Sequence, residues 1–200
     1  MFKIAVLISG NGSNLEAIIN ACKDNIINGS VNIVISNNPD AYGLQRAKNH
    51  SLDYKIIDNN KFETREDFDR ALVEELKYSN PDLIVLAGFM RILTPVVIEA
   101  FKNKIINIHP SLLPKYPGLD THNSVIKNGD LKHGVTIHFV NEVLDGGQII
   151  AQGELSVNPN ETEKQLKRRI HSIEHILLPK IVSKFADGSI DVNNIIYEEF

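Results

Sequence analysis

The sequence predicts an α/β protein whose mostly parallel sheet is flanked by helices and carries an antiparallel C-terminal hairpin. Up to residue 118, short apolar runs alternate with longer segments of helical periodicity. Such alternation is typical of βαβ crossovers, which build parallel sheets covered on both faces. After residue 118 two strand-like runs lie close together in the chain. No repeat or linker is evident, so we expect a single domain spanning residues 1–200.

The first half of the chain contains five apolar runs of strand length. These runs predict buried strands at 4–8, 31–35, 54–57, 83–87 and 105–108. Between them the apolar residues follow a helical period, which predicts helices near 13–24, 42–49, 64–79 and 95–101.

In the second half of the chain, the alternation of strand-like and helical segments stops. Residues 133–140 and 148–157 predict the two strands of the hairpin, joined by a loop that contains LDGG at 144–147. Residues 162–185 predict one long helix, because Thr162 and Gln165 have the spacing of a capping box and an apolar stripe follows. Residues 190–197 are expected to form a final short strand.

Composition and charge narrow the class of protein. The hydrophobic fraction of 42% and the charged fraction of 23% are typical of soluble globular proteins. A net charge of −4 argues against a nucleic-acid partner. The single Cys22 excludes a disulfide framework and a multi-cysteine zinc site. The apolar run at residues 4–8 is too short for a signal peptide or a membrane span, so we expect a cytoplasmic protein without a membrane partner.

The run IINIHPSLLPKYPG, at 105–118, carries the strongest chemical signal. Asn107 and His109 end an apolar strand, and alternation places both side chains on one side of it. Pro110 keeps His109 extended. Ligands of open α/β sheets bind at the carboxyl ends of strands. If Asp145 of the LDGG loop joined them, the set could bind an oxyanion and move a proton.

Each of these residues also has a simpler interpretation. Asn107 and His109 could be ordinary polar residues at a strand end, although two of them at i and i+2 before a stiff proline-rich segment favour function. Asp-Gly is a common turn pair, so Asp145 taken alone is better interpreted as a turn residue.

A glycine-containing loop follows the first strand and opens a helix. In this loop, Gly12 would let the backbone approach a ligand, and Ser13 and Asn14 could add donors beside the free amides of a helix N-terminus. A tight turn with a plain N-cap is the alternative. The loop lacks the third glycine of a dinucleotide fingerprint and the lysine of a Walker motif, which favours a small phosphorylated metabolite over NAD or ATP.

Two further patterns are weaker. The segment LAGFMRIL, at 86–93, could line a slot for a flat heterocycle, but plain core is the better interpretation of the segment alone. His171 and His175 have a spacing that can chelate a metal, yet no third ligand is apparent and a solvated or ligand-facing helix side is favoured. His138 lies in mid-strand, where a satisfied buried histidine is the default. We therefore expect no metal.

Taken together, the motifs resemble the phosphoribosylglycinamide formyltransferase family over nearly the whole chain. The resemblance rests on LISGNGSNL, SNNPDAYGL, VLAGFMRIL, NIHPSLLPKYPG, HFV and LDGG, at 7–15, 36–44, 85–93, 107–118, 138–140 and 144–147. The HPSLLP and LDGG pieces also resemble other enzymes that use formyltetrahydrofolate. The GNGSN loop and the length favour the glycinamide ribonucleotide branch.

The resemblance implies a Rossmann-like sheet and a formyl transfer in de novo purine biosynthesis. The formyl donor would be 10-formyltetrahydrofolate, a cosubstrate, and the acceptor would be the amine of glycinamide ribonucleotide. The products would be formylglycinamide ribonucleotide and tetrahydrofolate. A monomer or homodimer is expected. The N-terminal half would bind the phosphate, and the C-terminal half would bind the folate and carry out catalysis.

The resemblance also implies roles for single residues. Asn107 and His109 would hydrogen-bond the developing oxyanion, and Asp145 would pair with His109, favour its cationic form and relay the proton through water. Phosphate contacts are implied for Gly12, Ser13 and Asn14, and a ribose or amine contact for Glu174. Folate contacts are implied for Arg65, Met90, Arg91, Ile92 and Leu93, and for the loop that begins with Val140 and Asn141. The chain departs from the family at Asp120, where related bacterial sequences often carry His.

Two other functions remain open at this stage. The protein could transfer the formyl group to another amine or to water, or it could be a non-catalytic module that binds a phosphometabolite. A binding module would have no need for Asn107, His109 and Asp145 together, so their presence counts against it.

Overall fold

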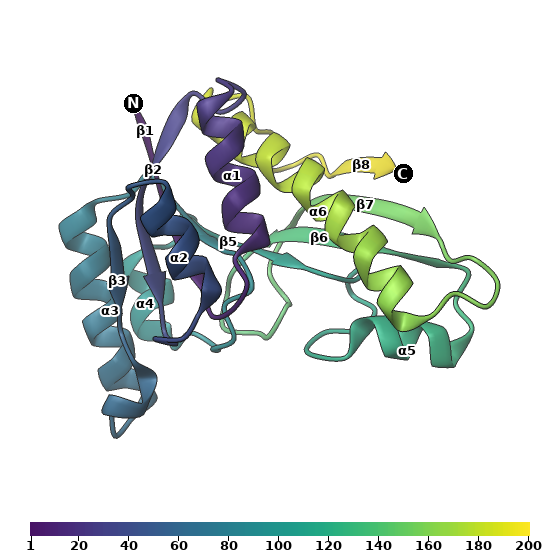
Figure 1. Cartoon of the computed structure of the whole chain (residues 1–200), viewed down its shortest axis with the longest axis horizontal. Coiled ribbons are helices and arrows are strands. Elements are labelled where there is room, and N and C mark those ends of the chain that lie inside the picture. Colours follow the sequence, from purple (N-terminus) through teal and green to yellow (C-terminus); the bar gives the residue numbers. More distant parts are fainter.

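The computed structural model describes residues 1–200, which form one eight-stranded sheet covered by helices (Figure 1). The strands are β1 (Phe2–Ile8), β2 (Gly29–Ser36), β3 (Tyr54–Ile56), β4 (Leu83–Leu86), β5 (Ile105–His109), β6 (Lys132–Phe139), β7 (Ile149–Ser156) and β8 (Ile196–Glu199). The helices are α1 (Ser13–Lys23), α2 (Tyr42–Asn49), α3 (Arg65–Ser79), α4 (Pro95–Ala100), α5 (Thr121–Asn128) and α6 (Glu163–Ala186), with a short 3₁₀ helix at Asn59–Lys61.

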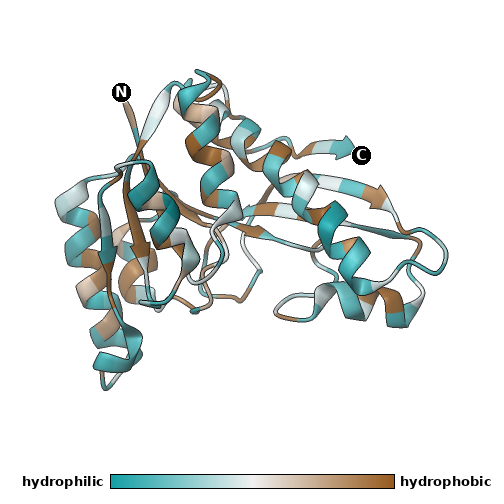
Figure 2. Ribbon diagram, viewed as in Figure 1, coloured by the Kyte–Doolittle hydropathy of each residue, from teal (hydrophilic) through white to brown (hydrophobic).

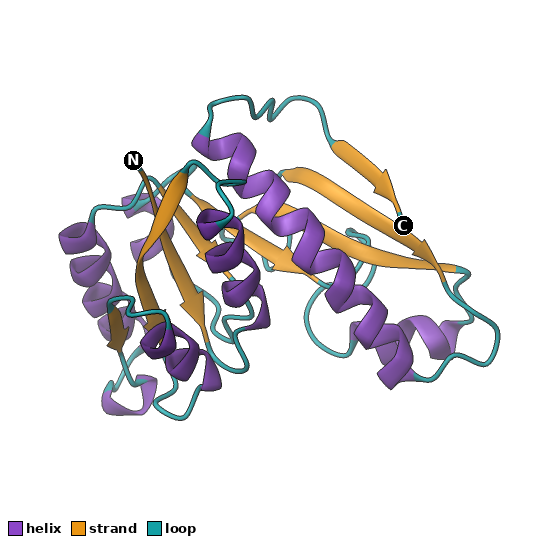
Figure 3. Ribbon diagram, turned by 45° about the horizontal axis from the view of Figure 1, so that its top comes forward, coloured by secondary structure: helices purple, strands orange, loops and turns teal.

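The sheet has the strand order β3-β2-β1-β4-β5-β6-β7-β8. All neighbours from β3 to β5 are parallel, whereas β6 runs antiparallel to both β5 and β7, and β8 is parallel to β7. The predicted parallel sheet with an antiparallel C-terminal hairpin is therefore confirmed. Figure 3 shows the long helix α6 lying across the C-terminal part of the sheet, with β8 at its outer edge.

The core is divided by the sheet into two layers. In β1, Ile4, Val6 and Ile8 pack on one face, while Ala5 and Leu7 pack on the other. The first face is covered by α1, α2, α5 and α6, and the second by α3 and α4. Figure 2 shows the hydrophobic colour concentrated along the central strands, as expected for strands buried on both faces.

Two predicted strands need correction. The segment 54–57 is not a buried strand, because β3 lies at the edge of the sheet and Tyr54 and Ile56 are each 40% exposed. The last strand does not begin near 190. Asp191 instead accepts hydrogen bonds from Asn193 and Asn194, which hold a turn until β8 starts.

Helix α5 was not predicted from the sequence. It has eight residues, several of them polar and weakly helix-forming, so no periodic signal is visible. Its place is set by tertiary contacts: it buries Val125, and His122 Nδ1 lies 3.0 Å from His133 Nε2 of β6. Burial lowers the pKa of both imidazoles to about 4, so the pair packs as neutral rings at pH 7.

The order in which the chain adds strands to the sheet reverses between β1 and β4. From β1 the chain first moves outward to β2 and β3, then returns to the other side of β1 as β4. This arrangement creates a topological switch point, at which ligands of open α/β sheets bind beyond the carboxyl ends of the strands. The loops after β1, β4 and β5 meet at this edge because the three strands are parallel. None of the helices combines the length and apolarity needed to cross a membrane.

Candidate active site

Asn107 and His109 lie at the carboxyl end of β5, where β6 runs beside it in the opposite direction. The register pairs Asn107 with His138 and His109 with Thr136. Directly opposed residues of antiparallel strands project to the same face, so His138 stands next to Asn107. The strand pairing thus builds a row of polar side chains at the end of an otherwise apolar strand.

The loop between β6 and β7 brings Asp145 to this row. Its Oδ2 accepts a 2.7 Å hydrogen bond from the Gly118 amide and lies 3.5 Å from His109 Nδ1, and its Oδ1 lies 3.5 Å from Asn107 Nδ2. Asp145 adopts a φ of 50°, in the left-handed region that Asp tolerates better than most residues. The three predicted residues therefore converge in space.

The second glycine of the LDGG loop, Gly147, is required for a steric reason. A Cβ atom on Gly147 would lie 1.7 Å from the carbonyl oxygen of Phe139, because the loop passes directly over the end of β6. Only glycine permits this approach. The close crossing returns the chain to β7 while keeping Asp145 above β5.

The two imidazoles of the site are held in defined tautomers by backbone carbonyls. His109 Nε2 lies 2.8 Å from the Tyr116 carbonyl oxygen, which can only accept, so Nε2 carries a hydrogen and Nδ1 faces Asp145. His138 Nδ1 lies 2.8 Å from the Phe139 carbonyl oxygen, which leaves His138 Nε2 to accept from Asn107 Nδ2 at 3.1 Å. This contact orients the side-chain amide of Asn107 so that its NH₂ group faces the site.

His138 is the residue that sequence reasoning missed. Its mid-strand position predicted a satisfied buried histidine, and it is indeed only 2% exposed. Its neighbours make it part of the site: Asn107, as described, and Asp145, whose Oδ1 lies 3.7 Å from His138 Nε2. The β5–β6 register reveals this role, and that register is not readable from periodicity.

The electrostatics favour an ionised carboxylate at the centre of the site. Burial by itself would raise the pKa of Asp145, but the hydrogen bond from the Gly118 amide and positive charge on His109 hold this pKa below its usual range. The site therefore combines a carboxylate that can accept a proton with an amide and an imidazole that can donate to a developing oxyanion.

A second polar site surrounds the N-terminus of α1. Gly12 is the N-cap residue with φ 72°, and a Cβ there would lie 2.7 Å from Gly43 Cα, so the position requires glycine. The first-turn amides, including those of Ser13 and Asn14, have no partner within the helix and favour an anion. Arg46 of α2 binds the carbonyl oxygen of Asn11 at 2.9 Å, a basic neighbour that the sequence analysis did not identify.

Glu174 of α6 joins this second site across 160 residues of chain. Asn14 Nδ2 donates to Glu174 Oε2 at 3.0 Å, and the two side chains are 8% and 5% exposed. Asn14 Oδ1 has no partner. Burial raises the pKa of Glu174 to about 7, and the Asn14 hydrogen bond and the charge of Lys167 only partly oppose this effect. The predicted group of Gly12, Ser13, Asn14 and Glu174 is thus assembled in one place.

The segment after β4 lies next to the loop after β1. The Met90 amide donates to Ser9 Oγ at 2.7 Å, and Met90 and Ile92 are exposed. Arg65 of α3 donates to the Ile92 carbonyl oxygen at 2.6 Å. Leu93 differs from Met90 and Ile92 because its side chain is buried in the core.

Arg91 is held against the core rather than extended into solvent. The guanidinium carbon lies 4.6 Å from the centroid of the Phe68 ring, a cation–π contact. Its Nε atom is buried without a partner. An orphaned buried donor is costly, and this one lies in the segment predicted to contact folate.

The remaining predicted residues frame the Asp145 loop. The Val140 amide donates to the Ile105 carbonyl oxygen at 3.0 Å, and the Val140 side chain packs on the core. Asn141 is exposed and braces the loop by accepting from the Val143 amide at 3.0 Å.

Asp120 caps α5 in a left-handed conformation with φ 60° and makes no side-chain capping bond. His171 and His175 stack with ring centroids 6.3 Å apart, and no group of three metal-ligating side chains is found.

These features define an α/β enzyme with a polar loop and helix N-terminus at the switch point and an amide–imidazole–carboxylate centre at the end of β5. Residues 2–182 match the formyl transferase family, and the chain belongs to this family. The family resemblance predicted from the motifs is therefore confirmed.

Several similar proteins carry the name phosphoribosylglycinamide formyltransferase. The chain is 47% identical over 190 residues to phosphoribosylglycinamide formyltransferase of Escherichia coli, covering 95% of this chain and 90% of that protein. It is 43% identical to the enzyme of the same name from Haemophilus influenzae, covering 98% and 93%. The solved phosphoribosylglycinamide formyltransferase of Coxiella burnetii is 45% identical and superposes with a TM-score of 0.90, covering 94% and 88%.

We predict that Glu174→Gln removes the loss of stability that the wild type undergoes as pH rises from 4.5 to about 7. Between the ordinary value of 4.5 and the folded value of about 7, the folded protein binds more protons at this position than the unfolded chain. The free energy of unfolding therefore falls as pH rises through this window and levels off above it. The amide cannot ionise, so the variant should gain roughly 3 kcal/mol relative to wild type between pH 4.5 and 8.

Urea denaturation at several pH values measures this effect. Glu142→Gln, at an exposed position, is the matched control and should follow the wild type. Parallel pH dependence of the Glu174→Gln variant and the wild type would contradict the prediction.

Proposed function

We propose that this protein transfers the formyl group of 10-formyltetrahydrofolate to the amine of glycinamide ribonucleotide, in de novo purine biosynthesis. The products are formylglycinamide ribonucleotide and tetrahydrofolate. The observation that carries the proposal is the convergence of Asn107, His109 and Asp145 at the end of β5. The names of the similar proteins support the choice of substrates.

The oxyanion is stabilised by two donors. As the amine nitrogen bonds to the formyl carbon, negative charge grows on the formyl oxygen. The Asn107 NH₂ group, already oriented by His138, and protonated His109 Nδ1 can both donate to this oxygen. Both donors are fixed before the reaction, so little reorganisation opposes their action.

The proton is moved by Asp145. The attacking amine must lose a proton, and the nitrogen that leaves the formyl carbon must gain one. The carboxylate of Asp145 lies 3.5 Å from both His109 and Asn107, longer than a charge-assisted hydrogen bond. Catalytic contacts of this kind tighten in the complex. Asp145 therefore accepts the amine proton and relays it, through water, to the leaving nitrogen.

The ribonucleotide is bound around the N-terminus of α1. Its phosphate accepts from the free amides near Gly12 and from the side chains of Ser13 and Asn14, where the helix dipole adds to the attraction. Glu174 accepts from a hydroxyl of the ribose or from the amine. We add Arg46 to this site because its guanidinium lies against the same loop.

The folate is bound by the segment after β4 and the loop after β6. The exposed side chains of Met90 and Ile92, with the backbone around Leu93, form the wall of the pterin slot. Arg65 and Arg91 offer positive charge for the tail carboxylates, and the buried Arg91 Nε still lacks an acceptor. Val140 and Asn141 close the slot from the other side.

We also propose that the chain forms a single domain and acts as a cytoplasmic monomer or homodimer. One continuous sheet joins the phosphate-binding half to the folate and catalytic half, which supports a single domain. A cytoplasmic monomer or homodimer, with no nucleic-acid or membrane partner, agrees with the enzymatic names of the similar proteins.

We predict that formyl transfer depends on the ribonucleotide and on the centre at β5. Purified protein should release tetrahydrofolate only when both substrates are present, and Asn107→Ala and His109→Ala should each lower kcat by about a hundredfold or more. A spectrophotometric assay of folate product measures both effects. Product formed without the ribonucleotide would point instead to hydrolysis, and absence of turnover in folded wild type would point to a binding module.

We also predict that Ser13→Ala raises KM for glycinamide ribonucleotide about tenfold, because it removes a hydrogen bond to a charged phosphate. The kcat value and the KM for the folate should stay near those of the wild type, since the interaction is made equally in ground and transition states. Steady-state kinetics with each substrate varied in turn provides the internal control. An unchanged KM for the ribonucleotide would remove Ser13 from the phosphate site.

A further inference from the structure

Tyr116 adopts a backbone conformation that is unusual for its residue type. Its φ is 55°, in the left-handed region that few residues other than glycine and asparagine occupy. Such a conformation is unfavourable for a residue with a side chain and persists only where the surrounding structure imposes it. Tyr116 lies seven residues after His109, within the stiff segment that joins β5 to α5.

The strained backbone directs the Tyr116 carbonyl toward the catalytic imidazole. This oxygen lies 2.8 Å from His109 Nε2 and also accepts from Ser111 Oγ at 3.1 Å. The same Ser111 hydroxyl lies 2.7 Å from the Lys115 carbonyl oxygen, so two consecutive carbonyls of the segment are tied to one side chain. The backbone contact to His109 is therefore part of a small, connected network.

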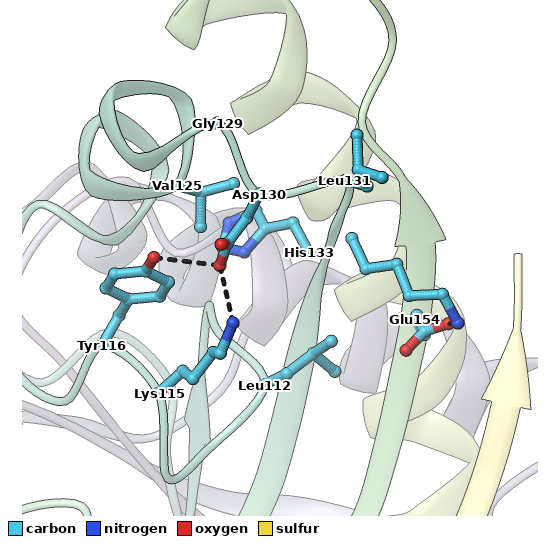
Figure 4. Close-up of a pocket in the computed structure, with 10 residues that line it drawn as sticks. Leu112, Lys115, Tyr116, Val125, Gly129, Asp130, Leu131, His133 and Glu154 are labelled. Atoms are coloured by element: carbon cyan, nitrogen blue, oxygen red, sulfur yellow. Dashed lines mark hydrogen bonds and ion pairs between the residues drawn. The ribbon is translucent and has the colours of Figure 1, made fainter.

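The phenol of Tyr116 is fixed at its far end. Its Oη donates to Asp130 Oδ2 at 2.9 Å and accepts from Asn128 Nδ2 at 2.8 Å. Lys115 Nζ binds the same Asp130 oxygen at 3.0 Å. Figure 4 shows Tyr116 and Lys115 both pointing to Asp130, and all three residues line a surface cavity. The Lys115 contact holds the pKa of Asp130 below its usual range, so the acceptor is ionised at neutral pH.

We propose that Tyr116 is a positioning residue for formyl transfer: anchored by Asp130, it holds the carbonyl that keeps a hydrogen on His109 Nε2 and leaves Nδ1 for the reaction. Acceptors face both ring nitrogens of His109, Tyr116 on one side and Asp145 on the other. A neutral ring can donate to only one of them. The protonated ring donates to the Tyr116 carbonyl from Nε2 and keeps Nδ1–H for the formyl oxygen. Loss of the Tyr116 contact lets a neutral ring place its single hydrogen toward Asp145, and a neutral ring is a weaker donor to the formyl oxygen than the protonated one. The inference rests on the proposed role of His109 in formyl transfer.

The test uses Tyr116→Phe, which keeps the ring packed against the core but removes both phenol contacts. Asp130→Ala removes the anchor from the other side, and Asp130→Asn keeps an oxygen that accepts from the phenol. Tyr78→Phe, at a tyrosine that is 89% exposed, is the control. Two readouts are needed: steady-state kinetics, and ¹⁵N NMR of the histidine rings, which distinguishes a hydrogen on Nε2 from one on Nδ1.

Tyr116→Phe and Asp130→Ala should each lower kcat about tenfold, with KM values close to wild type, because only the orientation of a reacting group changes. In both variants the His109 ring should lose its uniform Nε2–H signature. Asp130→Asn and the control should retain the wild-type kcat and spectrum. Wild-type kcat in Tyr116→Phe and Asp130→Ala, or a lowered kcat with an unchanged His109 spectrum, would overturn the inference.

The two readouts separate this inference from the proposed function. If wild-type protein shows no formyl transfer, the proposed function fails, while the NMR comparison still tests whether Tyr116 sets the tautomer of His109. If the wild type is active, the kinetics of the variants test the positioning role directly.

Discussion

The antiparallel pairing of β5 with β6 is the constraint on which the active site depends. The strands from β3 to β5 are parallel to one another, and β6 alone runs in the opposite direction. The reversal places His138 opposite Asn107 and lets the chain return over the end of β5 by a short loop. That loop carries Asp145 and can pass so close to β6 only because Gly147 has no side chain. A parallel β6 would need a crossover connection and would take Asp145 elsewhere.

A second long-range contact joins the ends of the chain. The buried hydrogen bond between Asn14 of α1 and Glu174 of α6 ties the first helix to the last. It brings an acidic side chain to a helix N-terminus that otherwise attracts anions. The burial that keeps the pKa of Glu174 near 7 also limits the repulsion that a bound phosphate would meet. The phosphate-type loop and the β5 centre lie along one edge of the sheet, because β1, β4 and β5 are parallel.

Periodicity and motif position predicted much of this arrangement, but not the features set by tertiary contacts. Asn107 and His109 could be read from alternation along one strand, and the loop at Gly12 could be read from its place after the first strand. His138 could not, because its role depends on the β5–β6 register. Helix α5 and the edge position of β3 were missed because packing, not local propensity, decides them. The contacts of Arg46 and Tyr116 involve backbone carbonyl oxygens and leave no pattern in the sequence.

The most direct measurement of the central claim is the effect of Asp145→Asn on kcat and on both KM values. The amide keeps the size of the side chain and an oxygen for the Gly118 amide but removes the charge. Glu99→Gln, at an exposed position of α4, provides a control for loss of one negative charge. We predict that kcat falls by about a hundredfold or more while both KM values change little. Turnover near that of the wild type would contradict the account, because the site would then work without a carboxylate at its centre.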